Sequence, residues 1–137
     1  MNGAPIVIEK RIEIRWADLD AFRHVNNAVY LTYLEETRDS WLEAMVPEGR
    51  STWDYVLARV AIDFRRELRE EDEYLDASCR LLRLGRSSIV THEEVRTVDG
   101  ELAAEAEVVM VARDAQTGRS RPLTPAEREA FGRVAES

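Results

Sequence analysis

One helix-like segment followed by a succession of three or four strand-like segments constrains the fold of this chain more than any other feature of its sequence. Residues 27–45 contain neither Gly nor Pro. Apolar side chains recur within them at three- and four-residue spacing, which predicts a helix buried over much of its circumference. The predicted buried stripe comprises Tyr30, Leu34, Thr37, Trp41 and Ala44, widened by Leu31, Leu42 and Met45.

After Trp53 the period of the pattern changes from helical to strand-like. Apolar and polar side chains alternate there, as in Val60, Ile62 and Phe64 against Asp63 and Arg65. The strand-like segments are residues 56–68, 73–85, 87–98 and 101–113. Because no helix pattern separates them, they predict a meandering antiparallel sheet of the α+β class and not a doubly wound parallel sheet.

A strand and a helix cap precede this sheet in the sequence. Isoleucines at even positions between Ile6 and Ile14 predict a half-buried first strand. Asn26 is a good N-cap, so the long helix is expected to begin at Asn27 and to end before Pro47.

The C-terminal tail predicts a second, shorter helix. Thr124 and Glu127 have the spacing of a capping box, and Pro125 stands at the first helical position. Propensity and caps explain this segment fully. We therefore interpret it as a solvated surface helix with no catalytic part.

Length and charge narrow the class of protein. A chain of 137 residues is expected to form a single domain over residues 1–137. Its formal net charge of −8 argues against a nucleic-acid binder, which needs a basic face for phosphates. No apolar run approaches the roughly 20 residues of a membrane span, and one cysteine allows no intramolecular disulfide. These features predict a cytoplasmic protein that binds neither nucleic acid nor membrane.

Polar groups crowd residues 18–27, directly ahead of the long helix, but metal and phosphate chemistry fit them poorly. An EF-hand loop counted from Asp18 would need an oxygen ligand and a glycine where Phe22 and Arg23 stand. A phosphotransfer aspartate would follow a parallel strand in an array of alternating strands and helices, and the sequence shows no pattern of that kind. Zinc sites need three or four ligands. The soft ligands of the whole chain are His24, His92 and Cys79, so the sequence predicts no metal site.

Acyl chemistry fits the same residues better. A helix N-terminus carries unpaired N–H groups and about half a positive charge. The backbone N–H of Asn27 can therefore polarise a carbonyl group and stabilise its oxyanion. Asp20, in the connecting loop, can face the carbonyl carbon either as a nucleophile or as the base that activates water.

A purely structural interpretation stands beside the catalytic one. Asp18, close to Arg15 in the sequence, is expected to build the loop, and Asn26 to cap the helix. For Asp20 and His24 the residue types alone leave catalytic and structural roles open.

The segment "DLDAFRHVNNAVYLTYLEETR", residues 18–38, resembles the signature of the hotdog-fold acyl-CoA thioesterases, the 4-hydroxybenzoyl-CoA thioesterase-like family. It is also similar to the "DLD…HVNN" segment of plant acyl-ACP thioesterases. The order of elements follows the resemblance over residues 6–114. It implies a hotdog fold, a five-stranded antiparallel sheet wrapped around one long central helix, with protomers that assemble into homodimers or homotetramers.

The same resemblance implies roles for single residues. The catalytic aspartate of the family falls on Asp20, and the amide that polarises the thioester carbonyl falls on Asn27. His24 matches the histidine of the acyl-ACP branch. That branch also uses an asparagine, and this chain has Phe22 at the corresponding position, which weakens the transfer of its mechanism.

Glu35 is an alternative catalytic acid. Some hotdog thioesterases use a carboxylate two turns into the central helix, and Glu35 lies eight residues after Asn27. The sequence favours another role for Glu35, an ion pair with Arg38 at three-residue spacing.

Further residues are predicted to contact the substrate. Val25 and Tyr30 flank the helix start with the spacing of a hydrophobic staple and are expected to line the site. Basic and hydroxyl side chains of two segments are candidates for the phosphates of coenzyme A. They are Arg83, Arg86, Ser87 and Ser88 in the "RLGRSS" turn, and Arg65 and Arg66 in "FRREL". We expect His92 at a surface or interface and Cys79 as a small buried hydrophobe.

These observations predict an enzyme that hydrolyses an acyl-CoA thioester to a free acid and coenzyme A, with no cofactor apart from the coenzyme A of the substrate. Two alternatives stay open: a hotdog hydratase or dehydratase that uses Asp20 and His24, and a non-catalytic acyl-binding module. Acyl carrier protein is the alternative carrier, although a net charge of −8 makes docking on an acidic carrier less favourable. The length of the acyl group is expected to follow from pocket depth, which packing between protomers sets.

Overall fold

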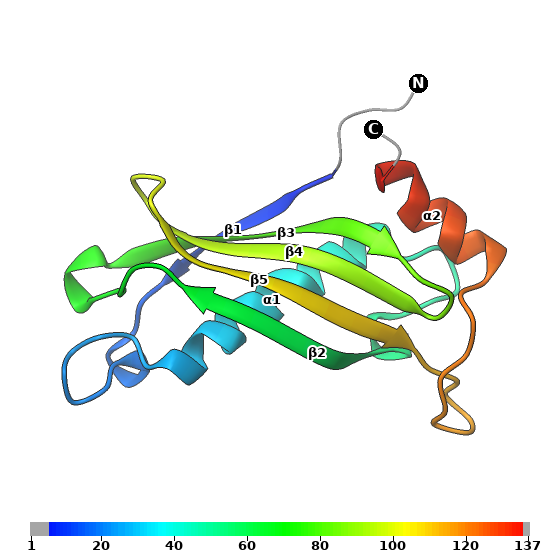
Figure 1. The fold of residues 1–137 in the computed structure, drawn as a ribbon, viewed down its shortest axis with the longest axis horizontal. Coiled ribbons are helices and arrows are strands. Elements are labelled where there is room, and N and C mark those ends of the chain that lie inside the picture. The colour runs from blue at the N-terminus through cyan, green and yellow to red at the C-terminus, as the bar shows by residue number, and fades with distance from the viewer. Residues whose placement is uncertain (1–5, 136–137) are drawn as a thin grey trace.

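A computed structural model describes residues 6–135 of the chain as one sheet and two α-helices (Figure 1). The strands are Ile8–Glu13 (β1), Tyr55–Phe64 (β2), Tyr74–Leu84 (β3), Ser88–Thr97 (β4) and Leu102–Ala112 (β5). The helices are Asn27–Met45 (α1) and Pro125–Ala135 (α2). Within this part of the chain, neither helix has the length and apolar content of a membrane span.

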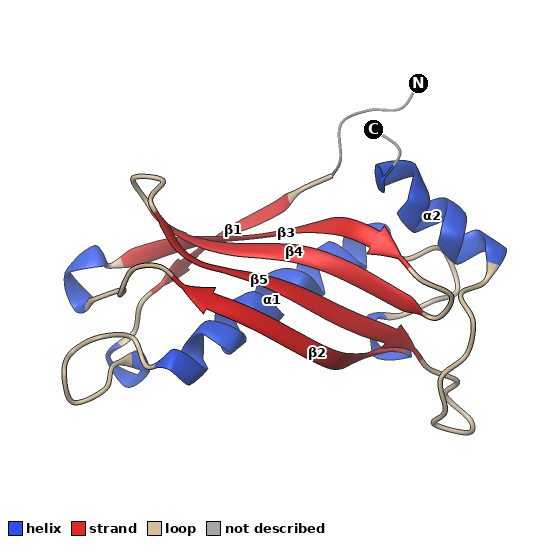
Figure 2. Cartoon of the chain, viewed as in Figure 1, coloured by secondary structure: helices blue, strands red, loops and turns tan. Residues whose placement is uncertain are grey.

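The sheet is antiparallel throughout, with the strand order β1-β3-β4-β5-β2. Helix α1 lies across one face of it, and the other face is open in Figure 2. Strands β3, β4 and β5 form the predicted meander, but β2 pairs with β5 and not with β3. The prediction of a simple meander is therefore wrong for β2, because alternation predicts a strand and not its neighbour. The α+β hotdog fold implied by the resemblance is confirmed.

Helix α1 begins at Asn27, as predicted. The Asn26 side chain accepts a hydrogen bond from the N–H of Ala28 at 2.9 Å, which satisfies one of the free donors of the first turn. Val46 is the C-cap, directly before Pro47. The buried face matches the predicted stripe at four of its five positions. Ala44 is exposed instead, and so is Leu31, because only the side of α1 that faces the sheet is covered.

The buried face of α1 also contains an ion pair, which the sequence did not predict. The Arg38 guanidinium donates to both carboxylate oxygens of Glu93 on β4, at 2.8 and 3.0 Å. Glu93 also accepts from the Thr91 hydroxyl at 2.6 Å and lies 3.6 Å from the Cys79 sulfur. The predicted pairing of Arg38 with Glu35 is therefore wrong, because tertiary packing turns the guanidinium inward.

Helix α2 has the predicted capping box. The N–H of Glu127 donates to the Thr124 hydroxyl at 3.1 Å, and the N–H of Thr124 donates to the Glu127 carboxylate at 2.8 Å. The helix is not a solvated surface element, however. Phe131 is fully buried, with its ring stacked on Trp41 of α1 at 5.7 Å between centroids.

Glu127 shows why α2 is anchored to the core. Its carboxylate is fully buried, accepts a hydrogen bond from the Tyr55 hydroxyl and receives two bonds from Arg121 at 2.8 and 2.9 Å. Burial alone would raise the pKa of Glu127, but the hydrogen bonds from Arg121, the Thr124 N–H and Tyr55 outweigh it and lower the pKa to about 2. The partners Tyr55 and Arg121 lie on other segments, so the cap pattern alone did not predict this anchor.

We expect Glu127→Gln to destabilise the fold. Because folding lowers the carboxyl pKa from 4.5 to about 2, the ionised form stabilises the protein above pH 4.5, and this contribution is lost as the pH falls through 2. At neutral pH the variant should lose about 2 kcal/mol or more of unfolding free energy. The difference from wild type should shrink as the solution is acidified.

Chemical denaturation between neutral pH and pH 3 measures this difference. Glu129→Gln is the matched control, because Glu129 is exposed on the same helix. Equal losses in the two variants at neutral pH would contradict the anchoring role.

Candidate active site

The loop between β1 and α1 is organised around the buried carboxylate of Asp18, which is 3% exposed. One of its oxygens accepts from the Arg15 N–H at 2.9 Å and from the Tyr33 hydroxyl at 2.8 Å. Arg15 also donates through its guanidinium at 3.3 Å. The backbone carbonyl of Asp18 accepts the N–H of Asn26 at 2.9 Å. Asp18 therefore has the structural role expected of it and ties the loop to the helix start.

Burial beside this carboxylate also affects Tyr33. Burial is the larger cause, and the hydrogen bond to Asp18 adds to it, so the pKa of Tyr33 is raised above its usual value. The phenol therefore stays protonated and remains a hydrogen-bond donor at working pH.

Asp20 uses its two carboxylate oxygens differently. Oδ1 accepts hydrogen bonds from the backbone N–H groups of Phe22 at 2.9 Å and His24 at 3.3 Å. A tight turn makes this possible, with Arg23 in the left-handed region at φ 65°. Among the described residues, none donates a hydrogen bond to Oδ2. One oxygen thus builds the loop and the other is available to a substrate.

A cavity of about 370 Å³ lies beside this loop. It is lined by Asp20, His24, Val25, Asn27, Tyr30, Phe64, Arg65, Arg66 and Glu67. The structure therefore brings together the predicted catalytic residues, the predicted staple and the two arginines of the "FRREL" segment. The last four lining residues come from the end of β2 and the chain after it, which the antiparallel sheet places beside the start of α1.

Asn27 presents the start of α1 to this cavity. No acidic residue occupies the first turn of the helix, so no side-chain charge offsets its dipole there. The Asn26 side chain takes the N–H of Ala28, and the Asn26 carbonyl takes the N–H of Val29. Among the described residues, none accepts a hydrogen bond from the Asn27 N–H, which leaves it free as a donor.

Phe64 and Glu67 are cavity residues that the sequence reasoning missed. The Phe64 ring meets the Tyr30 ring edge-on, with centroids 5.1 Å apart. Glu67 lies 3.3 Å from Nδ1 of His24. Both are sequence neighbours of Arg65 and Arg66, and this proximity could have identified them as cavity residues. No spacing along the chain links Glu67 to His24.

Tyr30 lines the same cavity and is held from two sides. Its hydroxyl oxygen accepts the N–H of Leu68 at 3.1 Å. Burial is the main cause that raises the pKa of Tyr30, so the phenol stays neutral.

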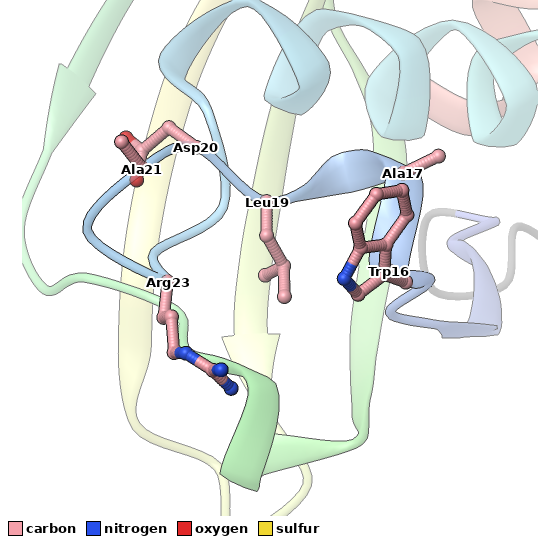
Figure 3. A pocket seen from close by; sticks show the side chains of 6 residues that line it. All are labelled: Trp16, Ala17, Leu19, Asp20, Ala21 and Arg23. Carbon is pink, nitrogen blue, oxygen red and sulfur yellow. The ribbon is translucent and has the colours of Figure 1, made fainter.

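A second cavity, of about 240 Å³, lies against the other part of the loop. It is lined by Trp16, Ala17, Leu19, Asp20, Ala21 and Arg23. Figure 3 shows the Trp16, Leu19 and Arg23 side chains extending to the same side of the loop. Asp20 lines both cavities and thus lies between them.

Two predicted substrate contacts lie elsewhere in this chain. Arg86 and Ser88 are at the β3–β4 turn, which is near α2 and at the opposite end of the molecule from the start of α1 (Figure 1). The Arg86 carbonyl accepts the N–H of Leu123 and the guanidinium of Arg128. Glu35 is exposed on α1 and lines neither cavity. The sequence could not show that these residues lie away from the cavities, because it did not give the order of the strands in the sheet.

Comparison with known proteins shows the class to which this arrangement belongs. A family model described as the Thioesterase-like superfamily matches residues 14–131. FadM, the long-chain acyl-CoA thioesterase of Escherichia coli (strain K12), is 30% identical over 120 residues, which cover 85% of this chain and 90% of FadM.

Solved structures agree with these sequence matches. A thioesterase from Thermus thermophilus, complexed with coenzyme A and Zn, has a TM-score of 0.84 at 32% identity, and the match covers 100% of this chain and 98% of that one. A DHNA-CoA thioesterase from Staphylococcus aureus has a TM-score of 0.82 at 18% identity, with 95% and 91% covered, and is similar in fold. The class is that of hotdog-fold thioesterases. This chain belongs to the thioesterase-like superfamily and is a distant homologue of FadM.

Proposed function

We propose that this thioesterase hydrolyses an acyl-CoA to a free acid and coenzyme A at the cavity between Asp20 and Asn27. One observation carries the proposal: a carboxylate with one anchored and one free oxygen shares a cavity with the free N–H at a helix start. The name of FadM, a long-chain acyl-CoA thioesterase, and the coenzyme A in the Thermus structure support this substrate class.

The chemistry follows from these two groups. With the thioester oxygen against the Asn27 N–H, the carbonyl carbon becomes more electrophilic, and the developing oxyanion is stabilised. Oδ2 of Asp20 then acts in one of two ways. As a base it takes a proton from water, whose oxygen attacks the carbon. As a nucleophile it attacks directly and forms a mixed anhydride, which water hydrolyses. In both cases the C–S bond breaks and coenzyme A leaves as a thiolate.

His24 contacts two residues of the cavity, Asp20 and Glu67. Its backbone N–H holds Asp20, and its ring nitrogen Nδ1 faces Glu67 at 3.3 Å. The ring is therefore oriented at the edge of the cavity, where it can donate a proton to the departing thiolate.

Replacing Asp20 with Asn tests the assignment. The amide oxygen can still accept from Phe22 and His24, so the loop should keep its shape, while the nucleophile or base is lost. We expect turnover to fall about 10²- to 10⁴-fold, measured as thiol release from short, long and aromatic acyl-CoAs. Asp39→Asn, at an exposed position of α1, is the matched control.

Other outcomes of that experiment identify the alternatives. Near-normal turnover in Asp20→Asn, with loss of turnover in Glu35→Gln, would transfer the role to Glu35. A hydratase or dehydratase would change the acyl chain and leave the thioester intact. A non-catalytic acyl-binding module would bind acyl-CoA saturably without releasing thiol.

Arg65 and Arg66 are the residues we propose for the phosphates of coenzyme A. Both line the cavity, and their guanidiniums are partly exposed, with Arg65 paired to Glu105 at 3.0 Å and Arg66 to Asp72 at 3.2 Å. In a chain with a net charge of −8, these cations offset a charge that would repel a polyphosphate. The same net charge disfavours an acidic acyl carrier protein as the carrier.

A truncated substrate separates phosphate binding from catalysis. We expect Arg66→Ala to raise KM for an acyl-CoA about tenfold. It should leave KM unchanged for the matching acyl-N-acetylcysteamine thioester, which has no phosphates. Arg86→Ala is the control from the opposite end of the chain. A rise in KM for Arg86→Ala alone would place the phosphates at the β3–β4 turn of a partner copy.

The free edge of β2 supports the expected assembly into homodimers or homotetramers. In the described sheet β2 pairs on one side only, and it exposes Val56, Leu57 and Phe64. An apolar edge strand with unpaired backbone groups pairs readily with another strand. We therefore infer that a second copy of the chain covers this edge, next to the cavity that Phe64 lines.

Sedimentation equilibrium measures this association. We expect wild-type protein to have at least twice the monomer mass of 15.7 kDa, and Leu57→Lys to shift the equilibrium toward monomer because a charge disfavours edge pairing. Val98→Lys, at the exposed β4–β5 hairpin, is the control. A monomeric wild type at micromolar concentration would exclude the proposed assembly.

A further inference from the structure

Three metal-ligating side chains meet on the face of the sheet opposite α1. Strand alternation turns Glu93 of β4 toward Arg38 of α1, so its neighbours His92 and Glu94 face the other way. Glu105 of β5 lies directly across from Glu94 in the register. Ligand atoms of His92, Glu94 and Glu105 all lie within 4.8 Å of one another. Their side chains are 21%, 23% and 29% exposed, so the cluster is partly shielded by the strands around it.

The two carboxylates are arranged to leave oxygens for a shared ligand. Like charges directly opposite each other on neighbouring strands are unfavourable. Two arginines outside the cluster reduce this repulsion, and each binds one oxygen of one carboxylate. Arg96 donates to Oε1 of Glu94 at 2.9 Å, and Arg65 donates to Oε2 of Glu105 at 3.1 Å. Oε2 of Glu94 lies 2.9 Å from Nε2 of His92. For Oε1 of Glu105, no donor is found among the described residues.

We propose that His92, Glu94 and Glu105 bind one divalent transition-metal ion of the zinc type. An imidazole nitrogen and two carboxylate oxygens are ligands that zinc accepts, and water completes the four-coordinate shell. Arg96 and Arg65 then act as outer partners that orient the ligating carboxylates, as is usual around protein metal sites. Hard ions such as Mg²⁺ and Ca²⁺ prefer an all-oxygen shell and should bind much more weakly.

The three proposed ligands lie outside the cavity at the helix start, although Arg65, which lines that cavity, donates to Glu105. His92 and Glu94 belong to the middle of β4 on the open face, and none of the three residues lines either cavity. A metal there would join β4 to β5 without touching the thioester. The sequence predicted no metal site because the third ligand comes from another strand, and only the register places Glu105 across from Glu94.

Zinc titration of the purified protein tests the proposal. Competition with a chromophoric chelator, in millimolar Mg²⁺ to suppress weak binding by other acidic residues, should give one Zn²⁺ per chain with micromolar affinity. Co²⁺ should bind at the same site. We expect His92→Ala and, independently, Glu105→Gln to weaken Zn²⁺ binding at least tenfold. Zn²⁺ should raise the melting temperature of wild type and leave that of His92→Ala unchanged.

His24→Ala is the matched control, because His24 is the other histidine of the chain. This variant should bind Zn²⁺ as wild type does. Absence of stoichiometric binding in wild type, or equal affinity in His92→Ala, would overturn the proposal. Loss of binding in His24→Ala alone would overturn it as well and place zinc beside Glu67. None of these results depends on thiol release, so failure of the zinc proposal and failure of the proposed hydrolysis can be distinguished.

Discussion

The buried carboxylate of Asp18 is the contact on which the candidate site depends. Its side chain accepts the Tyr33 hydroxyl from within α1, while its carbonyl accepts the N–H of Asn26 at the helix cap. A buried carboxylate left without these donors would be costly, so the loop and the helix have one satisfactory arrangement. Asp20 lies two residues after Asp18 in the same loop, so the contacts of Asp18 also fix the position of Asp20. The distance from the Asp20 carboxylate to the helix start is thus set by the contacts of Asp18.

An ion pair to the sheet and an aromatic contact to α2 hold the rest of α1 in place. Arg38 pairs with Glu93 in the core, and Trp41 stacks on Phe131, whose helix is anchored by Glu127. Buried ion pairs add little net stability compared with apolar packing, but an unpaired partner is strongly unfavourable. They therefore disfavour sliding or rotation of the helix, and the first turn of α1 stays where the cavity needs it.

The structural and catalytic interpretations of Asp20 turn out to be compatible. The turn amides of Phe22 and His24 hold one oxygen and orient the side chain, while the second oxygen has no donor in the described chain. Preorganisation of this kind lowers the reorganisation needed at the moment of reaction. The cavities on the two sides of Asp20 both combine apolar walls with arginine: Arg65 and Arg66 line one, and Arg23 lines the other beside Trp16 and Leu19.

The sequence by itself determined the local elements and the residues of the motif. Helix start, cap and strand positions followed from short-range patterns, because capping, helical periodicity and strand alternation act over a few residues. The family of hotdog thioesterases followed from the resemblance of the motif at residues 18–38. Only the tertiary structure decided which segments meet. Pairing of β2 with β5 brings Phe64 and Glu67 to the cavity, packing of α1 turns Arg38 to Glu93 and away from Glu35, and the buried partners of Glu127 convert a surface cap into an anchor. These contacts join residues far apart in the chain, and their energies depend on burial and on partners that no local pattern specifies.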